Sequence, residues 1–493
     1  MNVSFFSLKK YFIVAGVFAN VVLLMGSIFI INYVYSSGLS LPVFSEKLRQ
    51  NLVINKPKLL PILSPVLNVF ESLKVENFYF RPIEALGWVG IGANVNDNLS
   101  VDEYILVHNE ETLLAALNTA VAGNSILIEP GTYSFEQFSI PLKNAGTQEL
   151  PIKVLAKKLG TVKILLRGEG FVINKPHWQF TNLHLIGKCK IHSKCEHAFH
   201  IVGRGKHTLI QNNVLQDFNA MIKINGMRKI YPDYGIIINN TFFNSTPRKT
   251  VNPVTPIDLM HANHWRVSGN FIYDIQKSSG DKTSYAAFFK GGSELGIFER
   301  NLVMCAATLP NNYTSVGLSL GGGGSLQAHR RNKSTAEHTG GIIRNNIVMH
   351  CANDVGIYLN RAKDSLIVHN TLYNTLGIDV RFEQSTAVIN NNVISGRIKL
   401  RGNASFEENN NLVVSRGFIT NEERLTEYFK AADIGDFSWK KAYPVSSKGK
   451  VIKPDQIDIC EIQPSVEYIG AYSGNEFCLR ALNFKRKHDG ISL

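Results

Sequence analysis

The chain has 493 residues, with 52 Lys and Arg against 39 Asp and Glu, which gives a formal net charge of +13 with His neutral. Hydrophobic residues make up 44% of the chain, so it can bury a core and does not belong to the disordered class. It contains one long apolar run, which excludes a polytopic membrane protein. The basic balance favours an anionic partner: an acidic polysaccharide, a nucleic acid or an anionic lipid.

An uncharged apolar run at residues 11–35 follows Lys9 and Lys10. It exceeds both the roughly 20 residues that span a bilayer as a helix and the apolar core of about 7–15 residues in a secretory signal. We therefore predict a cytoplasmic tail at 1–10 and a transmembrane anchor at 11–35, because positive charge stays on the cytoplasmic side. A cleaved signal ending near Ser36 is the alternative. In both cases the body is exported, to the periplasm or the cell surface.

Six cysteines agree with an oxidising compartment. Cys189 and Cys195 are close enough to staple one loop, and Cys460 and Cys478 flank a hairpin-sized segment, so both pairs are predicted disulfides. The pairing of the other two cysteines stays open. No CxxC motif occurs, and we predict neither a metal site nor a cofactor.

A short pattern of β-prone residues, then Asn, then apolar residues recurs through the middle of the chain. Its asparagines are Asn213, Asn240, Asn270, Asn301, Asn346, Asn370, Asn392 and Asn411. A period in the twenties with loop insertions is typical of a solenoid. Asn suits bends because it tolerates a left-handed backbone and its amide hydrogen-bonds locally, so stacked coils would align a ladder of amides. The pattern predicts an all-β, right-handed parallel β-helix over residues 101–415. An antiparallel sandwich is disfavoured because hairpin dipeptides are not regularly placed.

The segments on either side of the repeat are predicted to support it. Residues 36–100 carry several prolines with little periodicity, and we interpret them as a stalk and packing segment. Residues 111–122 have an amphipathic pattern that predicts a helix over the open end of the first coil. After the repeat, residues 416–493 are predicted to form a C-terminal cap that begins with a helix at 421–432.

Aligning the strand that follows each Asn places outward side chains in two columns. One column holds Lys223, Asp258, Phe288, Ser319, Tyr358, Asp379 and Lys399. The other holds Asn225, Met260, Lys290, Gly321, Asn360, Arg381 and Arg401. Stacked strands lie about 4.8 Å apart, so seven coils give a face roughly 30 Å long. This basic and aromatic face suits a polyanionic sugar chain. The alternative is a solvated exterior whose charges only prevent edge pairing.

The chain resembles exported β-helix polysaccharide lyases of the chondroitinase-B and alginate-lyase type. The resemblance lies in the segments LLAALNTAVAGNSILIEPGTY and PIKVLAKKLGTVKI and in the Asn-rich coils that follow them. The chain is more similar to uncharacterised membrane-anchored β-helix repeat proteins in five short segments: CEHAFH, NPVTPIDL, FKGGS, GLSLGGGG and GIYLNRA. The resemblance covers roughly residues 104–412. It implies elimination across a uronic acid: a base removes the proton beside the sugar carboxylate and the linking oxygen leaves.

The resemblance implies that Lys290, in FFKGGS, is this base. Such a lysine must be partly neutral near the operating pH, which burial or nearby cations achieve. The chain departs from the lyases at Gly321, where they carry Arg-His-Gly, and at residues 285–288, where they carry acidic calcium ligands. Without a positive charge to neutralise the sugar carboxylate, the reaction would lack electrostatic stabilisation of its transition state, which is usually the largest contribution to catalysis. We predict Arg361 as the replacement, with His338 and Arg330 as further candidates.

The predicted substrate-binding residues lie on the same face: Asn225, Asp258, Tyr358, Asn360, Asp379 and Arg381. Asp258 and Asp379 would be about 19 Å apart at the strand spacing, beyond the roughly 5–9.5 Å that glycoside hydrolysis needs. His197 and His200 near one end of the face are interpreted as packed histidines. Basic pairs at 228–229 and 248–249 are interpreted as solvated turns, because an exported protein rarely meets nucleic acid.

Together these features predict an exported, membrane-anchored β-helix protein that acts on acidic polysaccharide, with uronate-polysaccharide lyase as the leading activity. The alternative is a non-catalytic polysaccharide-binding or envelope-scaffold protein. The missing Arg-His segment and calcium ligands favour this alternative over cleavage.

Overall fold

The structure is a computed structural model that describes residues 5–74, 89–93, 103–311, 313–322, 324–432, 436–440, 457–461, 463 and 468–473. It divides into two compact units. The first comprises residues 1–77 with 416–424, and the second comprises 78–415 with 425–493.

Most of the first unit is helical. The helices are α1 (Phe5–Ser36), α2 (Leu41–Asn55), the 3-10 turn η1 (Pro57–Leu59) and α3 (Leu60–Ser72). Within α1, Ile13–Ser36 is long and apolar enough to cross a membrane, a test that an N-terminal signal sequence also passes. The helical hairpin of α2 and α3 lies in the segment interpreted as a stalk. Pro42 and Pro61 stand in first turns, where the missing N–H has no partner to lose, whereas Pro65 lies inside α3.

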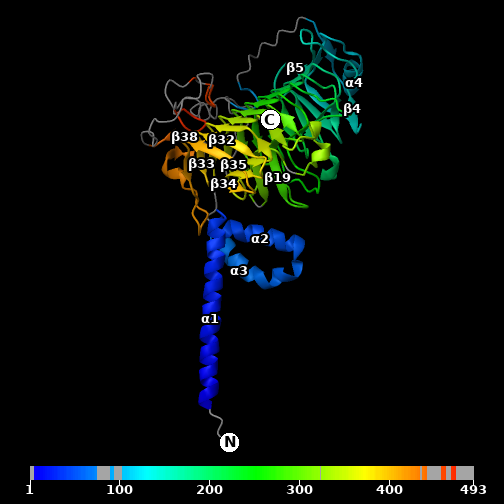
Figure 1. Cartoon of the computed structure of the whole chain (residues 1–493). Coiled ribbons are helices and arrows are strands. Elements are labelled where there is room, and N and C mark those ends of the chain that lie inside the picture. The colour runs from blue at the N-terminus through cyan, green and yellow to red at the C-terminus, as the bar shows by residue number, and fades with distance from the viewer. Residues whose placement is uncertain are drawn as a thin grey trace. The chain divides into compact units, whose positions relative to one another are not determined.

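The second unit is the predicted right-handed parallel β-helix, whose coils are shown in Figure 1. In the described residues, three parallel sheets run along it. The 12-stranded sheet contains β1 (Ile105–Val107), β2 (Ser125–Ile128), β5 (Ile152–Ala156), β8 (Trp178–Thr181), β11 (Leu209–Gln211), β14 (Ile236–Ile238), β17 (Arg266–Ser268), β21 (Ile297–Glu299), β25 (Ile342–Arg344), β29 (Ser365–Val368), β32 (Thr386–Asn390) and β35 (Ser405–Asn409).

The 11-stranded sheet contains β3 (Gly131–Ser134), β6 (Val162–Leu166), β9 (His184–Gly187), β12 (Val214–Gln216), β15 (Thr241–Phe243), β18 (Phe271–Tyr273), β22 (Leu302–Met304), β26 (Ile347–Met349), β30 (Thr371–Tyr373), β33 (Val393–Ser395) and β36 (Leu412–Val414). The 10-stranded sheet contains β4 (Ser139–Pro141), β7 (Gly170–Ile173), β10 (Phe199–Val202), β13 (Ile222–Asn225), β16 (Ile257–Met260), β19 (Thr283–Lys290), β23 (Thr314–Leu320), β27 (Ile357–Asn360), β31 (Gly377–Arg381) and β34 (Arg397–Arg401). A small parallel sheet joins β20 (Ser293–Glu294), β24 (His338–Thr339) and β28 (Ala362–Lys363).

The register of the 10-stranded sheet confirms the column that begins at Lys223. Its successive partners are Lys223, Asp258, Phe288, Ser319, Tyr358, Asp379 and Lys399. The second column is confirmed where Met260 pairs with Lys290 and where Asn360, Arg381 and Arg401 pair in turn. The residues between the two columns point inward and are fully buried, as the alternation of a strand requires: Ile224, Leu259, Phe289, Leu320, Leu359 and Val380.

The predicted asparagine ladder is present, and its backbone geometry is more specific than expected. From Asn240 to Asn411, each ladder amide oxygen accepts from the backbone N–H of the preceding ladder residue at 2.9–3.0 Å. The left-handed bend belongs to the residue before the ladder position, for example Arg300 (φ 52°) before Asn301. The ladder residues therefore act through their amides, while their predecessors absorb the bend.

The entry helix is confirmed as α4 (Glu110–Thr119), which begins with a capping box between Asn109 and Thr112. The helix predicted at 421–432 is wrong. This stretch contains the 3-10 turn η5 (Leu425–Glu427) and β37 (Phe429–Ala431), which pairs antiparallel with β38 (Asp436–Trp439). Phe429 contacts the rings of Phe437 and Trp439, so tertiary packing outweighs local helix propensity.

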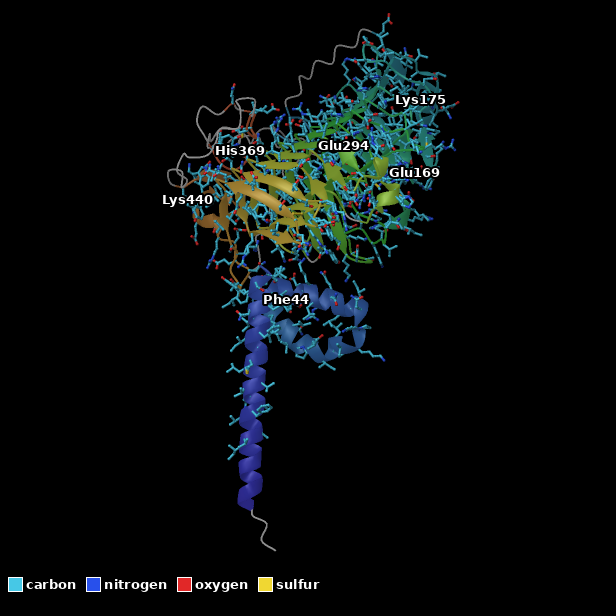
Figure 2. The ribbon with its side chains drawn as sticks, viewed as in Figure 1. Phe44, Glu169, Lys175, Glu294, His369 and Lys440 are labelled. Atoms are coloured by element: carbon cyan, nitrogen blue, oxygen red, sulfur yellow. A yellow bond between two sulfur atoms is a disulfide. The ribbon has the colours of Figure 1, made fainter. Side chains whose placement is uncertain are left out.

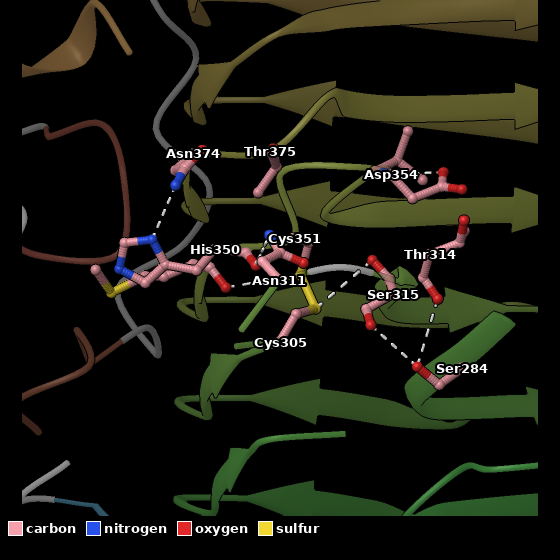
Figure 3. The surroundings of a disulfide bond; sticks show 12 residues. Ser284, Cys305, Asn311, Thr314, Ser315, His350, Cys351, Asp354, Asn374 and Thr375 are labelled. Atoms are coloured by element: carbon pink, nitrogen blue, oxygen red, sulfur yellow. Dashed lines mark hydrogen bonds between the residues drawn. A yellow bond between two sulfur atoms is a disulfide. The ribbon is translucent and has the colours of Figure 1, made fainter. Parts of the chain in front are cut away.

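The predicted disulfide between Cys189 and Cys195 is present. A second disulfide joins Cys305 and Cys351, which the sequence left unassigned, and Figure 3 shows it beside the hydrogen-bonded pair Ser284 and Ser315. Because Cys305 follows β22 and Cys351 follows β26, the bond links two neighbouring coils. The predicted bond between Cys460 and Cys478 involves Cys478, which lies outside the described residues.

Candidate functional site

Lys290 ends β19 in the middle of the 10-stranded sheet, and its side chain points away from the core. Its inward neighbour Phe289 stacks on Phe298 with ring centroids 4.0 Å apart. Lys290 instead places its Nζ 4.0 Å from the centre of the outward Phe288 ring. The strand stops there because Gly291 has a left-handed φ of 72°, and a Cβ at this position would come within 2.9 Å of His261.

The surroundings of Lys290 keep its amine poorly solvated. Burial lowers the pKa of Lys290, and the positive charge of Lys223 lowers it further, while Asp258 and Glu337 act in the opposite direction. Among the described residues, the Lys290 Nζ has no hydrogen-bond or ion-pair partner, and the Phe288 ring is its neighbour. An amine with a lowered pKa and no fixed partner is suited to accept a proton.

A buried ion pair lies on the two strands that precede β19. Lys223 Nζ lies 2.8 Å from Asp258 Oδ1, and the Asp258 side chain is buried. Burial alone would raise the pKa of Asp258, but the charges of Lys223 and Lys290 outweigh it, so the pKa is lowered. Asp258 is therefore an anion that interacts with both lysines, and Lys223 is a cation that is already paired.

Glu337 is the last residue of a long insertion, the connection between β23 and β24, and sequence reasoning did not place it beside Lys290. It is fully buried and accepts from the Gly291 N–H at 2.8 Å and from the Ser325 hydroxyl. Arg330, one of the predicted replacement cations, pairs with Glu337 at 3.3 Å. The carboxylate thus ties the turn after Lys290 to the insertion, whose irregular sequence gave no signal of this contact.

His261 and His338 also flank this part of the sheet. His261, missed by sequence reasoning, donates through Nε2 to the His329 carbonyl at 3.0 Å, and burial lowers its pKa. His338, predicted as a replacement cation, is buried and bonded to the Ser293 hydroxyl at 2.8 Å. Burial lowers the pKa of His338 to about 3, so it is neutral and structural at ordinary pH.

A second cluster lies two strands away from Lys290, across β23. The Tyr358 hydroxyl accepts from Asn360 Nδ2 at 3.0 Å and from Arg381 Nη1 at 3.4 Å. The guanidinium groups of Arg361 and Arg381 lie over the Phe382 ring, 3.8 and 4.5 Å from its centre. Arg361 therefore stacks on the coil beyond β27, and two strand spacings, about 10 Å, separate its strand from that of Lys290.

The remaining predicted contacts are also held by protein partners. Asp379 is paired with Arg401, and this hydrogen bond is the main cause that raises the pKa of Arg401. Asn225 Oδ1 lies 2.9 Å from His200 Nε2 at the other end of the column. Asn225, Asp258, Lys290, Tyr358, Asn360, Asp379 and Arg381 thus lie on the 10-stranded sheet, and Arg361 follows its strand β27 directly. The structure divides these residues between the surroundings of Lys290, the Tyr358 cluster and this end.

The histidine prediction is consistent with the contacts, whereas one basic turn was misread. His197 Nδ1 bonds the Ala220 carbonyl at 2.8 Å, and burial lowers the pKa of His197 to about 4. Arg248, predicted to be solvated, is buried and bonds Asn219 Oδ1 at 3.3 Å, with its pKa lowered by burial to about 10. Its long side chain turns inward to support the loop that also contains His192. The described residues contain no group of three His, Cys, Asp or Glu placed to hold a metal ion.

No family model matches the sequence, and no curated protein matches it. Solved structures with a similar fold include the pectate lyase Pel9A, with 14% identity, 82% of this chain and 98% of that chain covered, and a TM-score of 0.47. A rhamnogalacturonan lyase has 14% identity, the same coverage and a TM-score of 0.45. A PL6 family polysaccharide lyase from Pseudopedobacter saltans has 16% identity, 70% and 98% coverage, and a TM-score of 0.35. These likenesses concern the fold.

Proposed function

We propose that the chain is an exported, membrane-anchored protein that binds acidic polysaccharide along the outward residues of the 10-stranded sheet and cleaves it by β-elimination. Lys290 is the proposed base. The observation that carries the proposal is the Lys290 amine, which faces outward from a rigid sheet, has a lowered pKa and has no fixed partner among the described residues. The formal charge of +13 is consistent with an anionic partner.

The proposed step balances without a cofactor. The neutral Lys290 amine takes the proton from the carbon beside the uronate carboxylate, and the electron pair forms a double bond to the neighbouring ring carbon. The bond from that carbon to the linking oxygen breaks, and the oxygen leaves with a proton from the solvent or from the Lys290 ammonium. Lys223 contributes positive charge near the reacting carboxylate, although Asp258 offsets part of it.

The second cluster is the proposed site for a further part of the sugar chain. Arg361 and Arg381 have hydrogen bonds to Asn360 and Tyr358, and their planar groups stack on Phe382. Stacked guanidinium groups present their edges to a carboxylate, which they bind bidentately. At about 10 Å from the strand of Lys290 they would hold the chain without taking part in the elimination.

Export is proposed on two observations. α1 contains a 24-residue apolar stretch, Ile13–Ser36, with a mean hydropathy of 2.4. The two described disulfides are typical of oxidising compartments outside the cytoplasm. An anchored β-helix would then meet polysaccharide at the envelope.

The activity is tested with the full chain in detergent on alginate, chondroitin, dermatan and pectate, by following the absorbance of the unsaturated product. We expect product with one of these chains, and we expect Lys290→Ala to abolish it while circular dichroism stays unchanged. Lys153→Ala is the matched control, because Lys153 is an exposed lysine on the 12-stranded sheet. No product across the panel, or full activity in Lys290→Ala, would contradict the lyase proposal.

Binding without cleavage is the second candidate, because Lys223 is committed to Asp258 and the two stacked arginines lie across β23. In that case the panel gives retention on a polysaccharide column without product. Arg361→Ala with Arg381→Ala should then reduce retention, while Lys290→Ala retains most of it.

A further inference from the structure

α3 in the first unit carries an exposed apolar stripe. Ile62, Val66, Val69 and Leu73 recur at three to four residues, so they share one face of the helix. Ile62 is 72% exposed, Val66 53% and Val69 60%, although these are side chains that folded proteins normally bury. A contiguous stripe of this kind indicates that another apolar phase covers it.

α2 does not cover the stripe, because it packs on the opposite face of α3. Leu67 is buried there, and the Ser45 hydroxyl of α2 donates to its carbonyl at 3.1 Å. Arg49 of α2 pairs with Glu71 at 2.8 Å and donates to Asn68 at 2.7 Å. These contacts fix the hairpin and direct its apolar stripe away from α2.

α1 places the hairpin at the end of the apolar span. Residues 37–40 alone separate α1 from α2. The rings of Tyr33 and Phe44 meet edge to face with their centroids 6.5 Å apart, and Figure 2 labels Phe44. The span Ile13–Ser36 would be about 36 Å long as a helix, against about 30 Å of hydrocarbon. Figure 1 shows α3 displaced from α2 toward the level of the last turns of α1. With α1 in a bilayer, α3 lies at the depth where hydrocarbon meets headgroups.

The charges beside the stripe favour anionic headgroups. Lys56 and Lys58 are exposed just before α3, and within the described residues neither has a carboxylate partner. The hairpin carboxylates are neutralised internally, Glu46 by Lys74 at 2.7 Å and Glu71 by Arg49. Basic residues that flank an apolar helical face are typical of helices lying in a lipid interface.

We propose that α3 lies in the surface of the membrane that α1 spans, with its stripe among the acyl chains and Lys56 and Lys58 at anionic headgroups. The inference rests on the membrane placement of α1 in the proposed function. It adds a second attachment to the bilayer, which resists rotation of α1 about its own axis.

Variants that each carry one added tryptophan in the full chain test this placement of α3. They are reconstituted into vesicles of phosphatidylcholine, with or without phosphatidylglycerol, that contain brominated lipid, and the quenching of tryptophan fluorescence is measured. Ile62→Trp reports on the stripe and Phe18→Trp on α1. Asn51→Trp, on the side of α2 away from α3, is the matched control. The wild-type chain supplies the background from its 4 tryptophans. We expect several-fold stronger quenching at position 62 than at 51, and stronger quenching with phosphatidylglycerol, an increase that Lys56→Gln with Lys58→Gln removes.

The outcomes separate the two proposals. Quenching at 18 without excess quenching at 62 overturns the interfacial hairpin and leaves the anchor standing. Quenching at neither position overturns the anchor and the hairpin together. Quenching at 62 that does not respond to phosphatidylglycerol overturns the role given to the two lysines.

Discussion

Lys290 and Asp258 show how a sheet exterior can tune the protonation of one side chain. Burial favours the neutral amine, whereas the carboxylates of Asp258 and Glu337 and the face of the Phe288 ring favour the ammonium. Lys223 neutralises much of the Asp258 carboxylate, so it weakens the effect that would keep Lys290 charged. The balance between burial and these charges sets the pH at which Lys290 loses its proton.

Asp258→Asn is expected to lower the pKa of Lys290, because it removes an attraction and leaves Lys223 unpaired beside the amine. The measurement is the rate of acylation of Lys290 against pH, followed by peptide mass spectrometry, which does not depend on catalysis. Asp364→Asn, at an exposed carboxylate, should leave the profile unchanged. An unchanged profile in Asp258→Asn would refute this electrostatic account.

His338 is expected to make the fold acid-labile. Its Nδ1 bonds the Ser293 hydroxyl and its Nε2 accepts from the Gly296 N–H at 3.3 Å, and burial of the ring lowers its pKa to about 3, so the folded state resists a second proton. The unfolded chain takes up that proton near pH 6.5. Stability contributed by the neutral ring is therefore present above about pH 6.5 and is lost as the pH falls toward 3, at about 1.4 kcal/mol per pH unit.

The test is urea unfolding between pH 7 and 4. His338→Gln should show a shallower loss of unfolding free energy on acidification than the wild type. His108→Gln, at an exposed histidine, should follow the wild-type slope. Equal slopes in all three proteins would show that His338 is not the acid-sensitive group.

The element that repeats most regularly, the asparagine ladder, is also the one that the sequence predicts best. The ladder and the register of the two columns follow from the spacing of the repeated Asn and apolar residues in the sequence, because stacked coils must place equivalent residues one above another. The site is predicted less completely. Glu337 reaches the turn after Lys290 from a non-repeating insertion, and the stretch at 421–432 has helical spacing yet forms an antiparallel pair. Contacts made by insertions depend on tertiary packing, which spacing does not encode.

Asn301→Ala tests the ladder in the middle of the β-helix. The Asn301 amide donates to the Val267 carbonyl and to Asn346 Oδ1, both at 2.9 Å, in a fully buried setting. Its loss leaves buried polar groups without partners, and we expect a cost of about 3 kcal/mol in unfolding free energy. Asn411→Ala, at the half-buried last position, should cost clearly less. Similar thermal shifts for both would contradict the account.

At the scale of the molecule, the chain combines a solenoid with a small helical unit, and each is stabilised differently. The solenoid gains its stability coil by coil, from buried inward residues and the ladder. The helical unit is held by the ion pairs between α2 and α3, and its apolar stripe remains exposed in the protein alone. A long solenoid of this kind unfolds most readily from its ends unless something links its coils.

The disulfide between Cys305 and Cys351 is such a link. Converting both to Ala should lower the unfolding free energy by roughly 2–4 kcal/mol, since the bond closes a loop over a separation of 46 residues. Thermal melts of the double variant and the wild type measure the difference. Removing Cys189 and Cys195, which are 6 residues apart, should cost less because the closed loop is short. The reverse order would argue against the loop-closure explanation.

The same bond turns residues 306–350 into a covalent ring, and the whole insertion that contributes Ser325 and Glu337 lies within it. A protease that cuts this insertion once therefore opens the ring without releasing either half of the solenoid. The nicked protein should run as one band on a non-reducing gel and separate into two only after a thiol is added. The two halves of the solenoid would then still hold Lys290 in place after the insertion beside it has been cut.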